Sequence, residues 1–173
     1  KIEKRQVQEP TIESTIKGAR DAFTENYDDN LSLIRYRLKD PQLRIDEFTL
    51  GKRTLTTVAI IYIKDIANKN LVNTIKTKIS KINIDGILQS GHIQKFILNN
   101  AFNFFPQTGI VERSDIASGN ILDGKIIILV EGSNLALVLP KTFIEFVDAG
   151  DDHHDNIYNS IFSKFIRILC ICI

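Results

Sequence analysis

The chain has very few sulfur-containing residues and almost no excess of charge of either sign. It contains no methionine and no tryptophan, and its two cysteines, Cys170 and Cys172, both lie in the last apolar stretch. Residues 1–169 therefore have neither a disulfide nor a thiolate metal site, which suits a reducing compartment. The formal net charge is +1 at pH 7, so no strong field attracts nucleic acid. We therefore predict no nucleic-acid partner.

The motifs of common catalytic and cofactor sites are also absent from the sequence. It has no Gly-x-Gly-x-x-Gly fingerprint and no Gly-x-Ser-x-Gly nucleophile elbow. Residues 51–54, Gly-Lys-Arg-Thr, are similar to part of a phosphate-binding loop, but Asp46 stands where that pattern requires glycine. A turn between two strands is the favoured interpretation of this segment. We predict no enzymatic activity and no cofactor.

A pair of histidines is the only group that suggests a metal. His153 and His154 are flanked by Asp151, Asp152 and Asp155. Adjacent side chains point apart on a helix or a strand, so one ion cannot easily bind both histidines. We therefore interpret this segment as a solvated acidic loop and predict no metal.

Helical and extended patterns alternate along the chain. Residues 54–63 and 125–130 are apolar at consecutive positions, which is typical of strands that are covered on both faces. The apolar stripe of residues 23–38 has helical spacing and ends before Pro41, and Asp21 is positioned to cap this helix. Further helices are predicted over 70–82, 93–101 and 115–122, and further strands over 43–50, 109–113 and 135–139, the last of them after a hairpin turn at 131–134.

This alternation, with at least one hairpin, predicts the α/β class with mixed rather than all-parallel sheets. An aromatic connector at 102–106 is the predicted boundary between two small subdomains, whose sheets are flanked by helices. The predicted organisation is a flexible lead-in at 1–13, subdomains at 14–101 and 102–156, and a helix at 157–173.

The predicted helix at 157–173 suggests that a membrane segment adjoins this chain. Its only charges, Lys164 and Arg167, precede the apolar run 168–173, as at the cytoplasmic end of a transmembrane helix. The run is far shorter than the ~20 residues that a span needs. An amphipathic helix packed on its own domain explains 157–167 equally well, but 168–173 less well because all its faces are apolar. Because the chain also starts at Lys1 without a methionine, we expect a soluble domain severed from a membrane protein.

The densest polar set lies on and just before the predicted helix 23–38. A solvated face with pairs at i,i+4 spacing is the favoured interpretation. The alternative is a face that contacts a ligand or another domain, because arginine and asparagine offer fixed donors for a carboxylate. The members of this set are Arg20, Glu25, Asn26, Asn30, Arg35 and Arg37.

The same region carries a family resemblance. Residues 18–26 read Gly-Ala-Arg-Asp-Ala-Phe-Thr-Glu-Asn, and residues 30–39 read Asn-Leu-Ser-Leu-Ile-Arg-Tyr-Arg-Leu-Lys. These blocks resemble the opening signature of the A subunits of spore germination receptors, the GerA family. The resemblance spans residues 14–173 in register, with further blocks at 60–63, 84–91, 105–107, 112–115, 122–125 and 130–133.

The resemblance implies a hydrophilic N-terminal domain that precedes a multi-helix membrane region. It implies a receptor in the inner membrane of the spore, with B and C subunits as partners and this domain on the cytoplasmic, or core, side. It also implies a response to nutrients such as amino acids or sugars, and a fold similar to a two-lobed substrate-binding protein. We place Arg20, Glu25, Asn30 and Arg35 nearest the cleft that such lobes would form.

Two functions stay open at this point. The chain is either a non-catalytic module that senses a nutrient or couples its signal, or an assembly module that binds other receptor subunits and no small ligand. Two lobes that close on a ligand would favour the first function. A large exposed apolar patch, for example around 102–105, would favour the second. No set of residues in the sequence supports a third function, an enzyme that acts on phosphate or sugar substrates.

Overall fold

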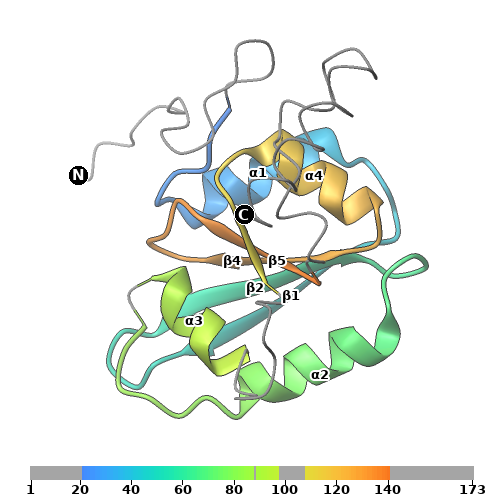
Figure 1. The fold of residues 1–173 in the computed structure, drawn as a ribbon. Helices are drawn as coiled ribbons and strands as arrows, with labels where there is room; N and C mark the ends of the chain where they lie inside the picture. The colour runs from blue at the N-terminus through green and yellow to red at the C-terminus, as the bar shows by residue number, and fades with distance from the viewer. Residues whose placement is uncertain (1–20, 88, 98–107, 141–173) are drawn as a thin grey trace, which may run out of the picture.

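The computed structural model describes residues 21–87, 89–97 and 108–140 (Figure 1). In these residues, five strands form one sheet, and four helices lie against its two faces. The strands are β1 (Leu43–Leu50), β2 (Thr56–Ile63), β3 (Gly109–Val111), β4 (Ile126–Val130) and β5 (Ala136–Leu139). The helices are α1 (Tyr27–Arg37), α2 (Lys69–Ser80), α3 (Ser90–Ile97) and α4 (Ser114–Leu122).

The strands are arranged in the order β1-β2-β4-β5-β3, and each neighbouring pair is antiparallel. β1 and β2 form a hairpin in which Leu43 lies opposite Ile63. β2 then pairs with β4, where Ile60 lies opposite Ile128. The two strands that the sequence predicted to be apolar on both faces are therefore neighbours inside the sheet.

Helices cover both faces of this sheet. α2 and α3 lie against one face, and α1 and α4 lie against the other (Figure 1). Because side chains alternate along a strand, Ile60 and Ile128 pack under α2 and α3, whereas Ile61 and Ile127 pack under α1 and α4. A strand between two helical layers must be apolar at consecutive positions, and this confirms the prediction for β2 and β4.

The start of α1 differs from the prediction. Its N-cap is Asn26, whose side-chain oxygen accepts a hydrogen bond from the backbone N–H of Asp28 at 3.0 Å. The prediction that Asp21 caps this helix is wrong, because the helix begins only at Tyr27. Ala22 forms an antiparallel bridge with Arg113 and thus continues the edge of the sheet beyond β3.

The segment with partial similarity to a phosphate-binding loop forms the turn between β1 and β2, as its favoured interpretation predicted. Gly51 adopts a φ of +86°, a conformation that glycine adopts without steric cost. The backbone N–H groups of Lys52 and Arg53 donate to the carbonyls of Ile84 and Asp85 at 3.1 and 2.9 Å. Because the fold itself uses these amides, they do not form an open phosphate cradle.

The α/β class is confirmed, but the sheet differs from the predicted mixed sheets of two subdomains. β1 and β2 precede the predicted boundary at 102–106, and β3, β4 and β5 follow it, yet all five strands form one antiparallel sheet. The physical reason is that β2 is buried on both faces and pairs along both edges, with β1 and with β4.

Other predicted features lie outside the described residues. These are the boundary at 102–106, the lead-in at 1–13 and the helix at 157–173, so the division into subdomains stays a prediction. Among the helices of the described ranges, none combines the length and the apolar character needed to cross a bilayer.

Candidate functional site

The residues predicted to lie nearest a ligand do not share one environment. Glu25 and Arg35 are exposed, whereas Asn30 is 1% exposed. Arg35 follows Asn30 by five positions on α1, so the two side chains leave the helix in different directions. Arg20 lies outside the described residues. That these residues bind a ligand stays a prediction.

Asn30 has a clear local role. Its side-chain oxygen accepts the backbone N–H of Thr24 at 2.7 Å, and its side-chain nitrogen donates to the carbonyl of Thr24 at 2.6 Å. A buried amide needs such partners, because an unsatisfied polar group is costly in the interior. Asn30 therefore fixes the segment before α1 against the helix itself.

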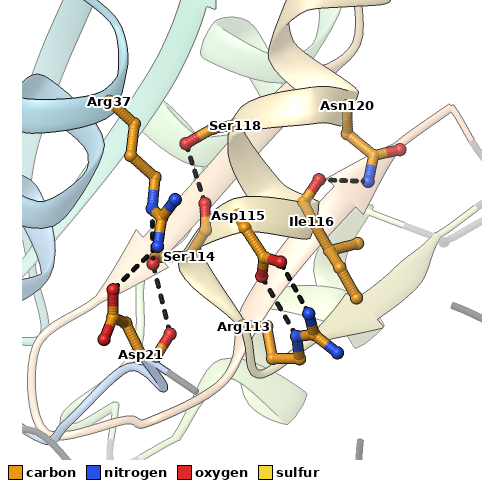
Figure 2. Close-up of polar contacts among 8 residues, drawn as sticks. All are labelled: Asp21, Arg37, Arg113, Ser114, Asp115, Ile116, Ser118 and Asn120. Carbon is orange, nitrogen blue, oxygen red and sulfur yellow. Dashed lines mark hydrogen bonds and ion pairs between the residues drawn. The ribbon is translucent and has the colours of Figure 1, made fainter. Parts of the chain in front are cut away.

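A different group of polar residues joins three segments that are distant in sequence (Figure 2). We call it the polar junction. Arg37, the last residue of α1, forms an ion pair with Asp21 at 2.8 Å, and its Nε donates to the hydroxyl of Ser114 at 3.0 Å. The Ser114 hydroxyl in turn donates to the carbonyl of Asp21 at 3.1 Å. The polar junction consists of these three residues, Asp21, Arg37 and Ser114, together with the neighbouring ion pair of Arg113 and Asp115 on either side of Ser114.

Backbone contacts hold the segment before α1 against the rest of the domain. The N–H of Phe23 donates to the carbonyl of Glu112 at 2.8 Å, and the N–H of Ser114 donates to that of Asp21 at 3.1 Å. Further along, the N–H of Gly132 donates to the carbonyl of Glu25 at 3.1 Å. Residues 21–25 are thus bound both to the start of α4 and to the turn between β4 and β5.

Arg113, which is buried, and Asp115, which is half-buried, form the ion pair of the polar junction. Arg113 is 1% exposed and binds the carboxylate of Asp115 through Nε at 3.0 Å and Nη2 at 2.6 Å. Burial by itself would raise the pKa of Asp115. The hydrogen bonds and the charge of Arg113 together outweigh burial, so the pKa of Asp115 lies below its ordinary value. The pair is therefore charged at neutral pH.

The contacts of Ser114 do not activate it as a nucleophile. The Ser114 hydroxyl donates to a carbonyl and accepts from a guanidinium, and neither contact would remove its proton to make a nucleophile. In the described ranges, no cluster of His, Cys, Asp and Glu is suited to hold a metal ion. The polar junction instead fixes the end of α1, the start of α4 and the segment before α1 relative to one another.

Reasoning from the sequence included Arg37 in the polar set but did not identify its partners. Asp21 precedes Arg37 by 16 positions and Ser114 follows it by 77, and no periodic pattern relates such distant positions. One signal was available. Blocks 18–26 and 112–115 both carry the family resemblance, and the polar junction brings these two blocks together.

Comparison with known proteins identifies the family. Residues 1–173 match the family described as Bacillus/Clostridium GerA spore germination protein. The chain is 37% identical over 171 residues to spore germination protein XA of Bacillus anthracis, which covers 99% of this chain and 34% of that protein. It is 33% identical over 167 residues to spore germination protein KA of Bacillus subtilis (strain 168), which covers 96% of this chain and 31% of that protein.

A solved structure agrees with these relatives. It is the crystal structure of the N-terminal domain of the A subunit of the Bacillus megaterium spore germinant receptor GerK3. The match has a TM-score of 0.56 and 37% sequence identity, and it covers 70% of this chain and 97% of the other. The chain belongs to the GerA family of spore germination proteins, as its sequence predicted. It spans about a third of the length of the curated relatives named above.

Proposed function

We propose that this chain is the N-terminal domain of the A subunit of a nutrient germinant receptor and that it transmits the germinant signal without catalysis. The similarity to the GerK3 domain supports the subunit and the position in it. The observation that carries the coupling role is the contact of Arg37 with both Asp21 and Ser114. Because one guanidinium bridges the segment before α1 and the start of α4, displacement of either segment strains the other.

We also propose where the domain works. The domain lies beside B and C subunits at the inner membrane of the spore, on the cytoplasmic, or core, side. Residues 157–173 lead towards the membrane region of the same subunit. The signals are nutrients such as amino acids or sugars. We do not propose that two separate lobes close on a ligand, because strands on both sides of the predicted boundary belong to one sheet.

The test uses spores whose full-length receptor subunit carries Arg37→Gln. The matched control is Lys39→Gln, which also removes one positive charge near the end of α1 but at an exposed position outside the polar junction. Three quantities are measured in each strain: the abundance of the subunit, its co-purification with the B and C subunits, and the rate at which nutrient lowers the optical density of the spore suspension.

We expect Arg37→Gln to slow germination severalfold while abundance and co-purification match the control. Normal germination in this variant would contradict the coupling role. If co-purification is lost together with germination, the alternative function as a pure assembly module would be favoured instead.

The predicted ligand face, on α1 and the segment before it, needs a separate test. Amino acids and sugars are titrated into the chain while backbone NMR shifts are followed, and Arg35→Gln and Glu25→Gln serve as variants. Shifts at millimolar nutrient that disappear in both variants would support nutrient capture at this face. The absence of shifts at that concentration would remove the ligand-binding version and leave signal coupling as the proposed role.

A further inference from the structure

A pocket of about 180 Å³ lies between the end of β2 and the first turns of α2. It is on the face of the sheet covered by α2 and α3, whereas the polar junction is formed by α1 and α4. Three lysines, Lys64, Lys69 and Lys76, contribute to its lining, and no acidic residue does. Like charges around one cavity favour an anion there.

The local fold brings these lysines together. Lys69, Asn73 and Lys76 follow one another at i, i+4 and i+7 on α2, so they lie on one face of the helix. Lys64 comes from the turn that connects β2 to α2. Ala67 and Val72, both buried, provide apolar surface in the same pocket.

One of the three charges is already balanced within the fold. The ammonium of Lys76 lies 2.8 Å from the carboxylate of Asp46 on β1 and donates to the hydroxyl of Tyr62 at 3.2 Å. The hydrogen bond to Asp46 is the main reason why the pKa of Lys76 is raised. Lys76 is therefore held in one place and stays protonated at neutral pH.

The other two charges are not balanced by the described part of the chain. Lys64 and Lys69 are exposed, and neither forms an ion pair with a described residue. After the pairing of Lys76 with Asp46, the pocket keeps an excess of two positive charges. Its amide and hydroxyl groups, from Asn73 and Tyr62, add neutral polar contacts beside the lysines.

We propose that this pocket binds a phosphate dianion. A phosphate monoester carries a charge of roughly −1.5 to −2 at pH 7, which matches the excess charge of the lining. Lysine binds phosphate as a point charge, whereas recognition of a planar carboxylate favours the fork of arginine, which the lining lacks. The volume corresponds to about six water molecules at ~30 Å³ each, so the pocket has room for a phosphate group.

This site is independent of the proposed coupling function, because it uses different residues on the opposite face of the sheet. The phosphate can belong to a small soluble compound or to the headgroup of a lipid. Both sources present the same dianion to Lys64 and Lys69, and the experiment below separates them.

The first measurement is a titration of the full 173-residue chain with inorganic phosphate at constant ionic strength, followed by backbone NMR. Sodium chloride serves as the reference salt. The test variant is Lys64→Gln with Lys69→Gln. The control variant is Lys52→Gln with Lys95→Gln, which removes the same charge from two exposed lysines outside the pocket.

We expect phosphate to shift the amide signals of residues 62–76 and to bind about tenfold or more weakly to the test variant, because two charged hydrogen bonds are lost. The control variant should bind like the original chain. Shifts that chloride reproduces, or an equal loss of affinity in both variants, would overturn the proposal.

A second measurement identifies the source of the phosphate. The chain is sedimented with vesicles that contain phosphatidic acid and with vesicles of phosphatidylcholine alone. Binding to the first kind only, lost in the test variant and displaced by inorganic phosphate, would assign the site to a lipid headgroup. Binding of inorganic phosphate without vesicle binding would assign it to a soluble phosphate compound. If neither probe binds, the proposal is wrong.

Discussion

Arg113 shows how the fold accommodates a charge in its interior. It is among the largest side chains that are fully buried in the described residues, and Asp115 neutralises it from two positions away. Removing Asp115 is costly because the buried guanidinium of Arg113 loses two charged hydrogen bonds. The position of Asp115 in the first turn of α4 also suits the positive end of the helix dipole.

Replacement of Asp115 by asparagine should therefore destabilise the domain in a pH-dependent way. At pH 7 we expect a loss of about 2 kcal/mol in the free energy of unfolding, since the charged hydrogen bonds to Arg113 are weakened. The folded-state pKa of Asp115 is lowered, so its contribution is complete above the unfolded value of 3.8 and is lost as the pH falls through the folded value.

The measurement is urea unfolding of the full chain and of Asp115→Asn at pH 7 and at pH 3. The difference between the two proteins should be smaller at pH 3. Asp65→Asn, which removes an exposed carboxylate, is the control and should behave like the original chain at pH 7. A difference that does not change with pH would contradict the role assigned to the charged pair.

Glycine positions provide a second test at the scale of single residues. A Cβ atom at Gly51 would lie 2.4 Å from the Thr54 hydroxyl and 3.3 Å from the Cα of Gly86, and its φ of +86° would strain an L residue. Gly132 has a φ of +79° but no atom within 4 Å of such a Cβ. Gly119 lies in α4, where a Cβ would also meet open space.

We expect the three alanine substitutions to differ in thermal stability in a fixed order. Gly51→Ala should cost about 2–3 kcal/mol, because strain and steric overlap add. Gly132→Ala should cost about 1 kcal/mol from strain alone. Gly119→Ala should stabilise the domain by about 0.5–1 kcal/mol through helix propensity. Equal costs at Gly51 and Gly132 would show that the turn can move away from Gly86.

At the scale of elements, α1 is fixed at both ends by side chains. Asn26 caps its start, and Arg37 at its end belongs to the polar junction. Its first residue, Tyr27, donates a hydrogen bond to Glu47 of β1 at 2.6 Å. Burial and this hydrogen bond to a carboxylate both raise the pKa of the Tyr27 hydroxyl, so the hydroxyl keeps its proton and can donate at physiological pH. α1 can therefore move only if contacts at its two ends break.

The capping interaction can be tested without disturbing the core. Asn26→Ala should lower the free energy of unfolding by about 1 kcal/mol, because the N–H of Asp28 loses its partner. Ser32→Ala, at an exposed position within the same helix, should be neutral or slightly stabilising. Chemical denaturation measures both variants. Equal stabilities would mean that Asn26 contributes no cap in solution.

At the scale of the whole molecule, the single sheet predicts that both helical layers unfold together. Ile60 faces one layer and Ile61 the other, although they are neighbours on β2. A mutation that disrupts the packing on either face of the sheet therefore destabilises the same strand, β2. It also weakens the packing of the helices on the opposite face.

Hydrogen exchange distinguishes this arrangement from two independent subdomains. We expect Ile60→Ala and Ile127→Ala each to lower stability by about 3 kcal/mol and to accelerate amide exchange equally in β2 and in β5. These strands lie on opposite sides of the predicted boundary at 102–106. Faster exchange confined to the mutated side would instead support the division into two subdomains.

The sequence by itself determined the approximate positions of the elements and the family. β1 was predicted with the bounds that the structure shows, and β2 and β4 were recognised because burial on both faces requires apolar residues at consecutive positions. These are local properties, so spacing and composition are sufficient to reveal them. The ordered blocks of the family resemblance are likewise readable along the chain.

Only the tertiary structure decided how the strands pair and which polar residues meet. A strand that is apolar on both faces does not specify its neighbours, so the pairing of β2 with β4 across the predicted boundary was not foreseen. The contact of Arg37 with Asp21 and Ser114 depends on where α1 and α4 pack on the sheet. Its geometry arises from contacts between distant segments, and local periodicity carries no information about such contacts.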